Sequence, residues 1–132
     1  MKALKRMALL LWIGSAGIFL LNATAVAQTH ADLLALKGRW TRIDGGYVLE
    51  IRNVEPGGRI QAAYYNPNPV NVSRAEAARQ GTAVLLFIEL RAPGYPGSTY
   101  KLIHDPRKDE LKGIYHQAAL QQDFEVVFAR SK

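Results

Sequence analysis

The sequence contains no cysteine, and this absence excludes several classes of site. Without thiols the chain has no disulfide framework, no thiolate nucleophile, no cysteine-ligated zinc or iron–sulfur site and no lipid anchor on an N-terminal cysteine. The Walker loop, the G-x-S-x-G nucleophile elbow and the H-E-x-x-H zinc motif are also missing. We therefore expect a protein that is not an enzyme, has no catalytic residues and uses no cofactor.

The fraction of charged residues is also low, and the chain is short. Only 21% of the 132 residues are charged, and 48% are apolar, which is typical of an ordered globular protein. A chain of this length supports one hydrophobic core, so we expect a single domain.

The first 27 residues have the pattern of a secretory signal peptide. Three basic residues within the first six precede an almost unbroken apolar run over residues 7–21, and small side chains follow at Ala25 and Ala27. Cleavage after Ala27 leaves residues 28–132 as the mature β-domain, and we expect that domain to be periplasmic or secreted. The alternative is an uncleaved membrane anchor, because the run nearly reaches the ~20 residues that a spanning helix needs.

Removal of the leader changes the charge of the protein. The leader carries three basic residues and no acidic one, so the net charge falls from +6 to +3. The remaining charges are mixed in sign, and no basic run is interleaved with aromatic residues. We expect no nucleic-acid partner and, once the leader is removed, no membrane span.

The rest of the chain has the period-two pattern of short strands separated by turns. We expect strands over residues 38–43, 47–54, 59–65, 82–91, 98–104, 111–118 and 122–129. Asp44-Gly45 predicts a hairpin, and Glu55-Pro56-Gly57-Gly58 predicts a type II turn.

Three segments depart from this pattern. Asp32 is expected to cap a short helix that ends at Gly38. Val70–Val72 is expected to be a short edge strand, because Pro67 and Pro69 before it cannot donate to a ladder. Residues 73–80 begin with the spacing of a capping box and predict a second short helix.

The expected fold is all-β: an antiparallel up-and-down meander of seven or eight strands. A closed or nearly closed barrel is favoured because closure removes exposed strand edges, and a two-sheet sandwich is the alternative. The interior is expected to be mostly filled, because many of its side chains are bulky. The residues expected to point inward are Trp40, Tyr47, Leu49, Ile51, Ile60, Ala62, Tyr64, Tyr100, Leu102, Leu111, Tyr115, Phe124, Val126 and Phe128.

Leu36-Lys37-Gly38-Arg39-Trp40, placed after a short helix and at the start of the first strand, resembles the G-x-W opening of the calycin barrels. This group includes the lipocalins, the avidins and the small bacterial periplasmic metalloprotease inhibitors. The resemblance implies that Trp40 closes one end of the barrel against the N-terminal segment, stacked with a late basic residue such as Arg130. The stretches over residues 64–69 and 95–100 resemble those of a small family of exported proteins, a resemblance that implies no particular activity.

Two irregular loops, residues 66–71 and 92–98, are expected to lie at one end of the barrel and to form a binding site. Proline stiffens both loops, and tyrosine offers contact area together with a polar tip. The candidate residues on or beside them are Tyr65, Asn66, Asn68, Tyr95 and Tyr100. The alternative is that both loops are only stiff turns.

Glu89 is a sixth candidate, because it interrupts the most apolar strand. A buried carboxylate needs a partner, so Glu89 is expected either in a structural ion pair or on the outer face of its strand, or else as a polar anchor in a ligand cavity. The residues His104, Asp105, Asp109 and His116 match no spacing typical of a metal site, so we expect no bound metal.

The expected function is that of a non-enzymatic barrel that binds an unknown small molecule or an envelope protein. One alternative is an inhibitor of an exported protease in which residues 28–36 enter the cleft of the enzyme, as the resemblance to the bacterial inhibitors implies. The other is a structural component of the envelope.

The signal peptide is tested by N-terminal sequencing of the exported protein. We expect the sequence to begin at Gln28, because the small residues before it fit signal peptidase. An exported chain that still begins at Met1 would contradict cleavage.

Overall fold

A computed structural model describes residues 28–132 of the chain. The signal peptide expected over residues 1–27 lies outside this range. None of the helices within the described range is long and apolar enough to cross a membrane.

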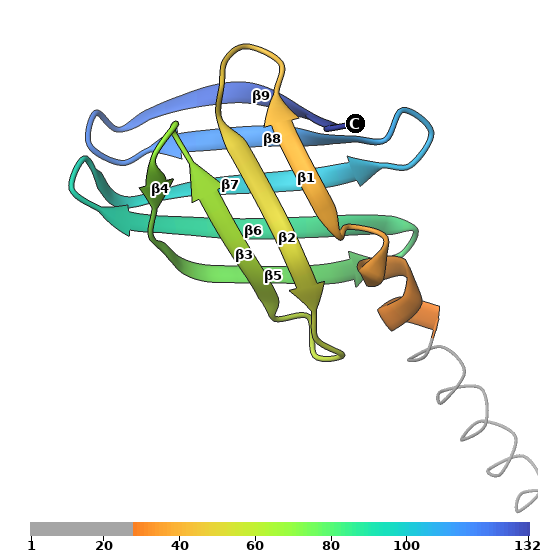
Figure 1. Ribbon diagram of the computed structural model, residues 1–132. Coiled ribbons are helices and arrows are strands. Elements are labelled where there is room, and N and C mark those ends of the chain that lie inside the picture. Colours follow the sequence, from red (N-terminus) through yellow and green to blue (C-terminus); the bar gives the residue numbers. More distant parts are fainter. Residues whose placement is uncertain (1–27) are drawn as a thin grey trace, which may run out of the picture.

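The described residues form one continuous antiparallel sheet of nine strands (Figure 1). The strands are β1 (Gly38–Arg42), β2 (Val48–Val54), β3 (Ile60–Tyr65), β4 (Pro69–Val70), β5 (Val72–Gln80), β6 (Ala83–Ala92), β7 (Tyr95–Asp105), β8 (Glu110–Gln117) and β9 (Gln122–Arg130). Their order is β4-β3-β2-β1-β9-β8-β7-β6-β5, so β1 pairs with β9 and every other neighbour is adjacent in sequence. This confirms the all-β meander; the expected edge strand at residues 70–72 is divided between β4 and the longer β5.

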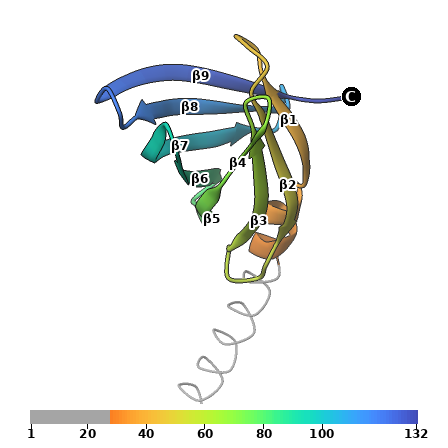
Figure 2. The same ribbon diagram turned by 60° about the vertical axis from the view of Figure 1, so that its left-hand side comes forward.

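The sheet curls into a nearly closed barrel in which β1–β4 cross over β5–β9 (Figures 1 and 2). The seam runs between β3 and β5, where Arg59 and Glu76 form an isolated bridge and the amide of Ala77 donates to the carbonyl of Gly58 at 2.7 Å. Gly58 has a φ of 93°, and a Cβ there would overlap the Ala77 carbonyl. The seam therefore requires glycine at position 58. A type II turn over residues 55–58 would need its positive φ at Gly57, so the expected type II turn is not formed.

The helix expected over residues 73–80 is wrong, because these residues belong to β5. Ala75 and Ala77 are buried while Arg74, Glu76 and Ala78 are exposed, which is the alternation of a strand. Pairing with β6 along nearly its whole length provides β5 with backbone hydrogen bonds. These tertiary contacts outweigh the helix propensity of its alanine, glutamate and arginine residues.

The N-terminal helix covers residues 28–34 and contains Asp32, so the expected capping role of Asp32 is wrong. Its carboxylate instead accepts hydrogen bonds from Arg79 of β5 at 2.5 Å and from Gln28 at 3.1 Å. Leu33 and Leu36 are buried against the barrel. The helix is therefore docked onto the sheet along its apolar side.

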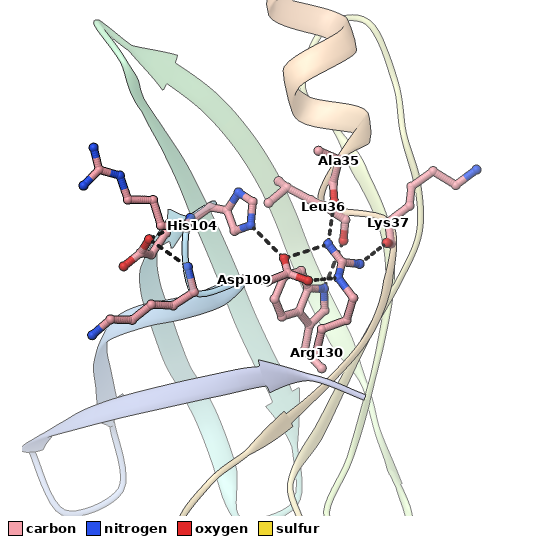
Figure 3. Close-up of polar contacts among 10 residues, drawn as sticks. Ala35, Leu36, Lys37, His104, Asp109 and Arg130 are labelled. Carbon is pink, nitrogen blue, oxygen red and sulfur yellow. Dashed lines mark hydrogen bonds and ion pairs between the residues drawn. The ribbon is translucent and has the colours of Figure 1, made fainter. Parts of the chain in front are cut away.

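Arg130 holds the end of this helix to the barrel (Figure 3). Its guanidinium donates to the carbonyls of Lys37 at 2.6 Å and Ala35 at 2.8 Å, and to the Asp109 carboxylate at 2.5 Å. The same group lies over the Trp40 ring, 4.2 Å from its centroid. The stacking of Trp40 with Arg130 that the calycin resemblance implied is therefore confirmed.

Trp40 and His104 complete this closed end of the barrel, and Figure 3 shows His104 beside Asp109 and Arg130. The Trp40 indole donates to the Leu36 carbonyl at 3.0 Å, and the His104 ring meets it edge-on with centroids 5.7 Å apart. His104 Nε2 lies 3.2 Å from Asp109 Oδ1. The hydrogen bonds from Arg130 and His104 hold the pKa of the Asp109 carboxyl below its usual value.

Side chains fill the inside of the barrel, as expected. The largest fully buried ones are Trp40, Tyr64, Tyr100, Phe128, Leu36, Leu49, Ile51, Ile88, Leu90, Leu102, Leu111 and Val54. The expected burial of Phe124 is wrong: it stacks on Tyr115 at the rim and stays 43% exposed. The two faces of the apolar strand β6 are covered unequally, since Leu86 is buried and Phe87 only half-buried.

Gly113 of β8 tests how closely the strands are packed. It lies opposite Leu102 of β7, and an added Cβ would overlap the Lys101 carbonyl and come 2.9 Å from the Leu102 Cα. We expect Gly113→Ala to lower the free energy of unfolding by about 1–3 kcal/mol, the usual cost of overpacking. Urea denaturation measures this change. Gly57→Ala, where a Cβ would meet nothing within 4 Å, is the control, and equal stability of the two variants would contradict the prediction.

Candidate functional site

The candidate site lies at the end of the barrel away from the N-terminal helix. The two proline-rich loops meet here, because Asn66 Nδ2 donates to the Tyr95 hydroxyl at 2.5 Å. The expectation that these segments share one end of the barrel is therefore confirmed. The expected loop over residues 92–98 is wrong, because Tyr95 begins β7 and only Pro93 and Gly94 separate β6 from β7. The hairpin predicted by Asp44-Gly45 also lies here, with Thr41 paired to Val48 and a longer loop than two residues between them.

This end carries a hollow of about 530 Å³ that we call the tyrosine mouth. Half of the ten residues in its lining are aromatic: Tyr47, Tyr64, Tyr95, Tyr115 and Phe124. Arg42, Asp44, Asn66, Gly94 and Gln117 complete the lining. Because the barrel interior below is filled, the mouth is a shallow site on top of a packed core.

Arg42 lies at the base of the mouth. Its side chain is only 9% exposed, and its guanidinium lies over the Tyr47 ring, 4.2 Å from the centroid. Nε donates to Asp44 Oδ1 at 2.9 Å, Nη2 donates to Asp44 Oδ2 at 2.5 Å, and Nη1 donates to the Tyr100 hydroxyl at 3.0 Å. Arg42 is thus fixed by a two-pronged ion pair on one side and by a tyrosine on the other.

The ionisation states in the mouth follow from these contacts. Burial by itself would lower the pKa of Arg42, but the hydrogen bonds to Asp44 and Tyr100 outweigh it and raise that pKa. The hydrogen bond from Arg42 lowers the pKa of the Asp44 carboxyl. At neutral pH the mouth therefore holds one cation and one anion, already paired.

The tyrosines beneath the mouth stay protonated. Burial raises the pKa of Tyr100 to about 12 and raises the pKa of Tyr64 further. Their hydroxyls share a hydrogen bond with the oxygens 2.7 Å apart. At neutral pH these groups provide donors, acceptors and ring surface, but no base.

The six candidate residues from the sequence are distributed over three places. Asn66 and Tyr95 line the mouth, and Tyr100 lies directly below it. Asn68 is exposed in the loop beside them, where its carbonyl accepts from the Asn66 amide. Tyr65 lies apart from the mouth, with its hydroxyl 3.5 Å from an Arg52 nitrogen.

Glu89 is also apart from the mouth. Its carboxylate accepts from the Ser73 hydroxyl at 2.8 Å and from Arg91 at 3.3 Å, on the strand face opposite buried Ile88 and Leu90. These contacts place it in a structural ion pair on the outer face, which was one of its expected positions. The hydrogen bond from Ser73 lowers its pKa, as do the charges of the nearby arginines.

Arg42 is the main residue of the mouth that the sequence reasoning missed. Trp40 was expected to point inward, and the period of two then places Arg42 on the same face. That signal was present, but Arg42 was not among the residues expected to point inward, and charged side chains are seldom buried without a partner. Asp44 was noted only as a turn residue.

The histidines first considered for a metal site lie apart. His104 contacts Asp109 at the closed end, whereas His116 Nδ1 lies 2.6 Å from Asp123 near the rim. Within residues 28–132 no three histidine or carboxylate side chains are grouped as metal ligands.

Two larger hollows lie on the outer surface of the sheet. One, of about 920 Å³, lies beside the seam along β5–β7, and one of about 830 Å³ follows β7–β9. Among the described residues the buried polar side chains are Arg42 and Ser98. Neither outer hollow has either of these in its lining, and the mouth has Arg42.

Comparison of the chain with protein families, with curated proteins and with solved structures found no match.

The Tyr100 hydroxyl forms a bridge of hydrogen bonds between Arg42 and Tyr64, and this bridge can be tested by removing that oxygen. Tyr100→Phe leaves Arg42 Nη1 and the Tyr64 hydroxyl without their partner in a buried position. We expect the free energy of unfolding to fall by about 1–3 kcal/mol, the cost of leaving buried polar groups unpaired. Tyr65→Phe is the control, because its hydroxyl makes only a long contact with Arg52, and it should change stability by less than about 0.5 kcal/mol. Equal effects in chemical denaturation would count against the bridge.

Proposed function

We propose that this protein is an exported, non-enzymatic β-barrel that binds a small molecule at the tyrosine mouth. The observation that carries the proposal is the mouth itself: a ring-lined hollow with a buried charged side chain at its base. Binding sites for small molecules combine apolar, concave walls with a few fixed polar groups.

The walls of the mouth suit a small, flat ligand. Aromatic rings supply large contact areas at a low cost in conformational entropy, and tyrosine hydroxyls add hydrogen bonds. The half-buried Tyr47 and Tyr95 retain surface that a ligand would cover. The filled core below limits the ligand to the depth of the mouth.

The scaffold around the mouth is well ordered by local contacts. The hydrogen bond between Asn66 and Tyr95 joins the loop after β3 to the start of β7, and prolines lie beside both residues. Preorganisation of this kind reduces the entropy lost when a ligand binds. Binding is also a common use of loops held on a rigid framework.

A catalytic role has less support from the chemistry of the mouth. Asp44 is its only carboxylate in the described lining, and its ion pair with Arg42 lowers its pKa. General acid–base catalysis needs a group whose pKa lies near the working pH. A binding role is therefore the simpler interpretation of these residues.

The alternative of a protease inhibitor requires residues 28–36 to enter the cleft of an enzyme. Leu33 and Leu36 are buried in the barrel, and Asp32 is paired with Arg79. These contacts favour a docked segment over a free one. The inhibitor and the structural envelope component both stay predictions, and no contact in the described range favours either.

An NMR titration with 2-naphthamide, a neutral aromatic probe, tests the proposed function. We expect shifts confined to amides around Tyr47, Tyr95 and Tyr115, because the ring-lined mouth offers stacking surface. Tyr95→Ala should weaken binding at least about tenfold, the equivalent of about 1.4 kcal/mol. Tyr65→Ala, which removes a tyrosine outside the mouth, is the matched control.

Two outcomes of this titration would contradict the proposed function. Shifts that map to the outer surface along β7–β9 would place the site elsewhere. Equal loss of binding in Tyr65→Ala and Tyr95→Ala would show that the mouth is not involved.

A further inference from the structure

We propose that the ligand of the tyrosine mouth is an aromatic carboxylate, whose anionic group replaces Asp44 as the partner of Arg42. This inference rests on the proposed function and adds the charge and the chemical class of the ligand. It follows from a difference between the two members of one ion pair: Arg42 is fixed in the barrel, and Asp44 is held on a loop.

Arg42 is built into the barrel. It belongs to β1, pairs with Phe128 of β9 and has a side chain only 9% exposed. Its guanidinium is packed near the rings of Tyr47, Tyr100 and Tyr115, with centroids 4.2, 6.0 and 5.7 Å away. Movement of this group would disrupt the upper core.

Asp44 is in the opposite situation. It lies in the loop between β1 and β2, its side chain is 53% exposed, and Gly45 and Gly46 follow it. An added Cβ at Gly46 would meet nothing within 4 Å, whereas one at Gly45 would come 2.8 Å from the Tyr47 ring, so the loop is open on its Gly46 side. The hydrogen bonds of its carboxylate side chain go to Arg42. Asp44 can therefore swing out while the barrel remains intact.

The edge of Arg42 that Asp44 occupies is the one that recognises carboxylates. Nε and Nη2 each donate to a different oxygen of Asp44, at 2.9 and 2.5 Å. This two-pronged geometry matches a carboxylate and neither an amide nor an ammonium group. Asp44 thus shows the position and orientation that a ligand carboxylate would take.

Charge makes the exchange selective. Arg42 and Asp44 are the charged residues in the described lining of the mouth, so departure of Asp44 leaves a buried guanidinium without an anion. An unpaired buried charge is costly, and a neutral ligand cannot replace the lost partner. The mouth therefore exchanges one anion for another.

Competition from Asp44 also means that the ligand needs an aromatic ring in addition to its carboxylate. As part of the same chain Asp44 competes at a high effective concentration, so a carboxylate alone, such as acetate, would be a weak competitor. A flat ring that stacks on Tyr47, Tyr95 or Tyr115 supplies the additional contact. The combination favours aromatic carboxylates over small inorganic anions.

The test compares 2-naphthoate with its neutral analogue 2-naphthamide on wild type, Asp44→Asn and Asp123→Asn. Asp44→Asn retains the shape of the side chain but removes the internal competitor, whereas Asp123→Asn makes the same change of charge beside His116. We expect Asp44→Asn to bind 2-naphthoate at least tenfold more tightly than wild type, as measured by fluorescence titration. The gain for 2-naphthamide in Asp44→Asn should be smaller than that for 2-naphthoate, and Asp123→Asn should behave as wild type.

A second measurement on the wild-type protein covers the case in which Asp44→Asn does not fold. Saturation with 2-naphthoate should shift the Arg42 Nε and Asp44 carboxyl NMR signals, because one carboxylate leaves Arg42 and another arrives. Unchanged signals at saturation would overturn the proposal.

Three binding outcomes would also overturn it. They are no gain for 2-naphthoate in Asp44→Asn, an equal gain in Asp123→Asn, and an equal gain for 2-naphthamide. If any of these is found while 2-naphthamide still binds at the mouth, the proposal that the ligand is a carboxylate is wrong and the proposed function is retained. If 2-naphthamide does not bind at the mouth, the proposed function itself is wrong.

Discussion

The pairing of β1 with β9 is the contact on which both ends of the barrel depend. It joins the first strand to the last through only three residue pairs, Trp40 with Arg130, Thr41 with Ala129, and Arg42 with Phe128. The first of these pairs places Trp40 under the guanidinium that holds the N-terminal helix. The last brings Arg42 over the aromatic core at the mouth. One short ladder therefore positions the closed end and the candidate site together.

This arrangement places two arginines at the two ends of the barrel, Arg130 beside the N-terminal helix and Arg42 at the mouth. Arg130 donates to the carbonyls of Ala35 and Lys37, which follow the helix, and to the Asp109 carboxylate in the turn between β7 and β8. Arg42 has Tyr100 below it, but its carboxylate partner comes from an exposed loop. Both carboxylates lie on exposed turns, with the Asp109 side chain 45% and the Asp44 side chain 53% exposed. Arg130 also donates to two backbone carbonyls, and Arg42 donates to the buried Tyr100 hydroxyl. The proposed ligand recognition at the mouth rests instead on the burial of Arg42, whose side chain is 9% exposed against 30% for Arg130.

Local patterns in the sequence were sufficient for most of the strands and insufficient where the chain meets a distant partner. The alternation of Tyr47, Leu49 and Ile51 defines the inner face of β2 without further information. Residues 73–80 have the composition of a helix, yet β6 provides hydrogen bonds along β5 that no local pattern reveals. Phe124 follows the inward period correctly but lies at the rim, because its depth depends on where the strand ends relative to the core.

The sequence by itself determined the all-β meander, the inward aromatic set and the position of Trp40, because these follow from the period of two and from turn chemistry along the chain. The end shared by segments 66–71 and 92–98 depended on the chain returning across the barrel after Val70, and that return is made by strand β5 rather than by the expected helix. Only the tertiary structure decided that Arg42 is buried, that Asp44 is its partner and that Glu89 lies outside. The reason is that burial of a charge depends on which groups neutralise it, and those groups are brought together by strand pairing rather than by sequence distance.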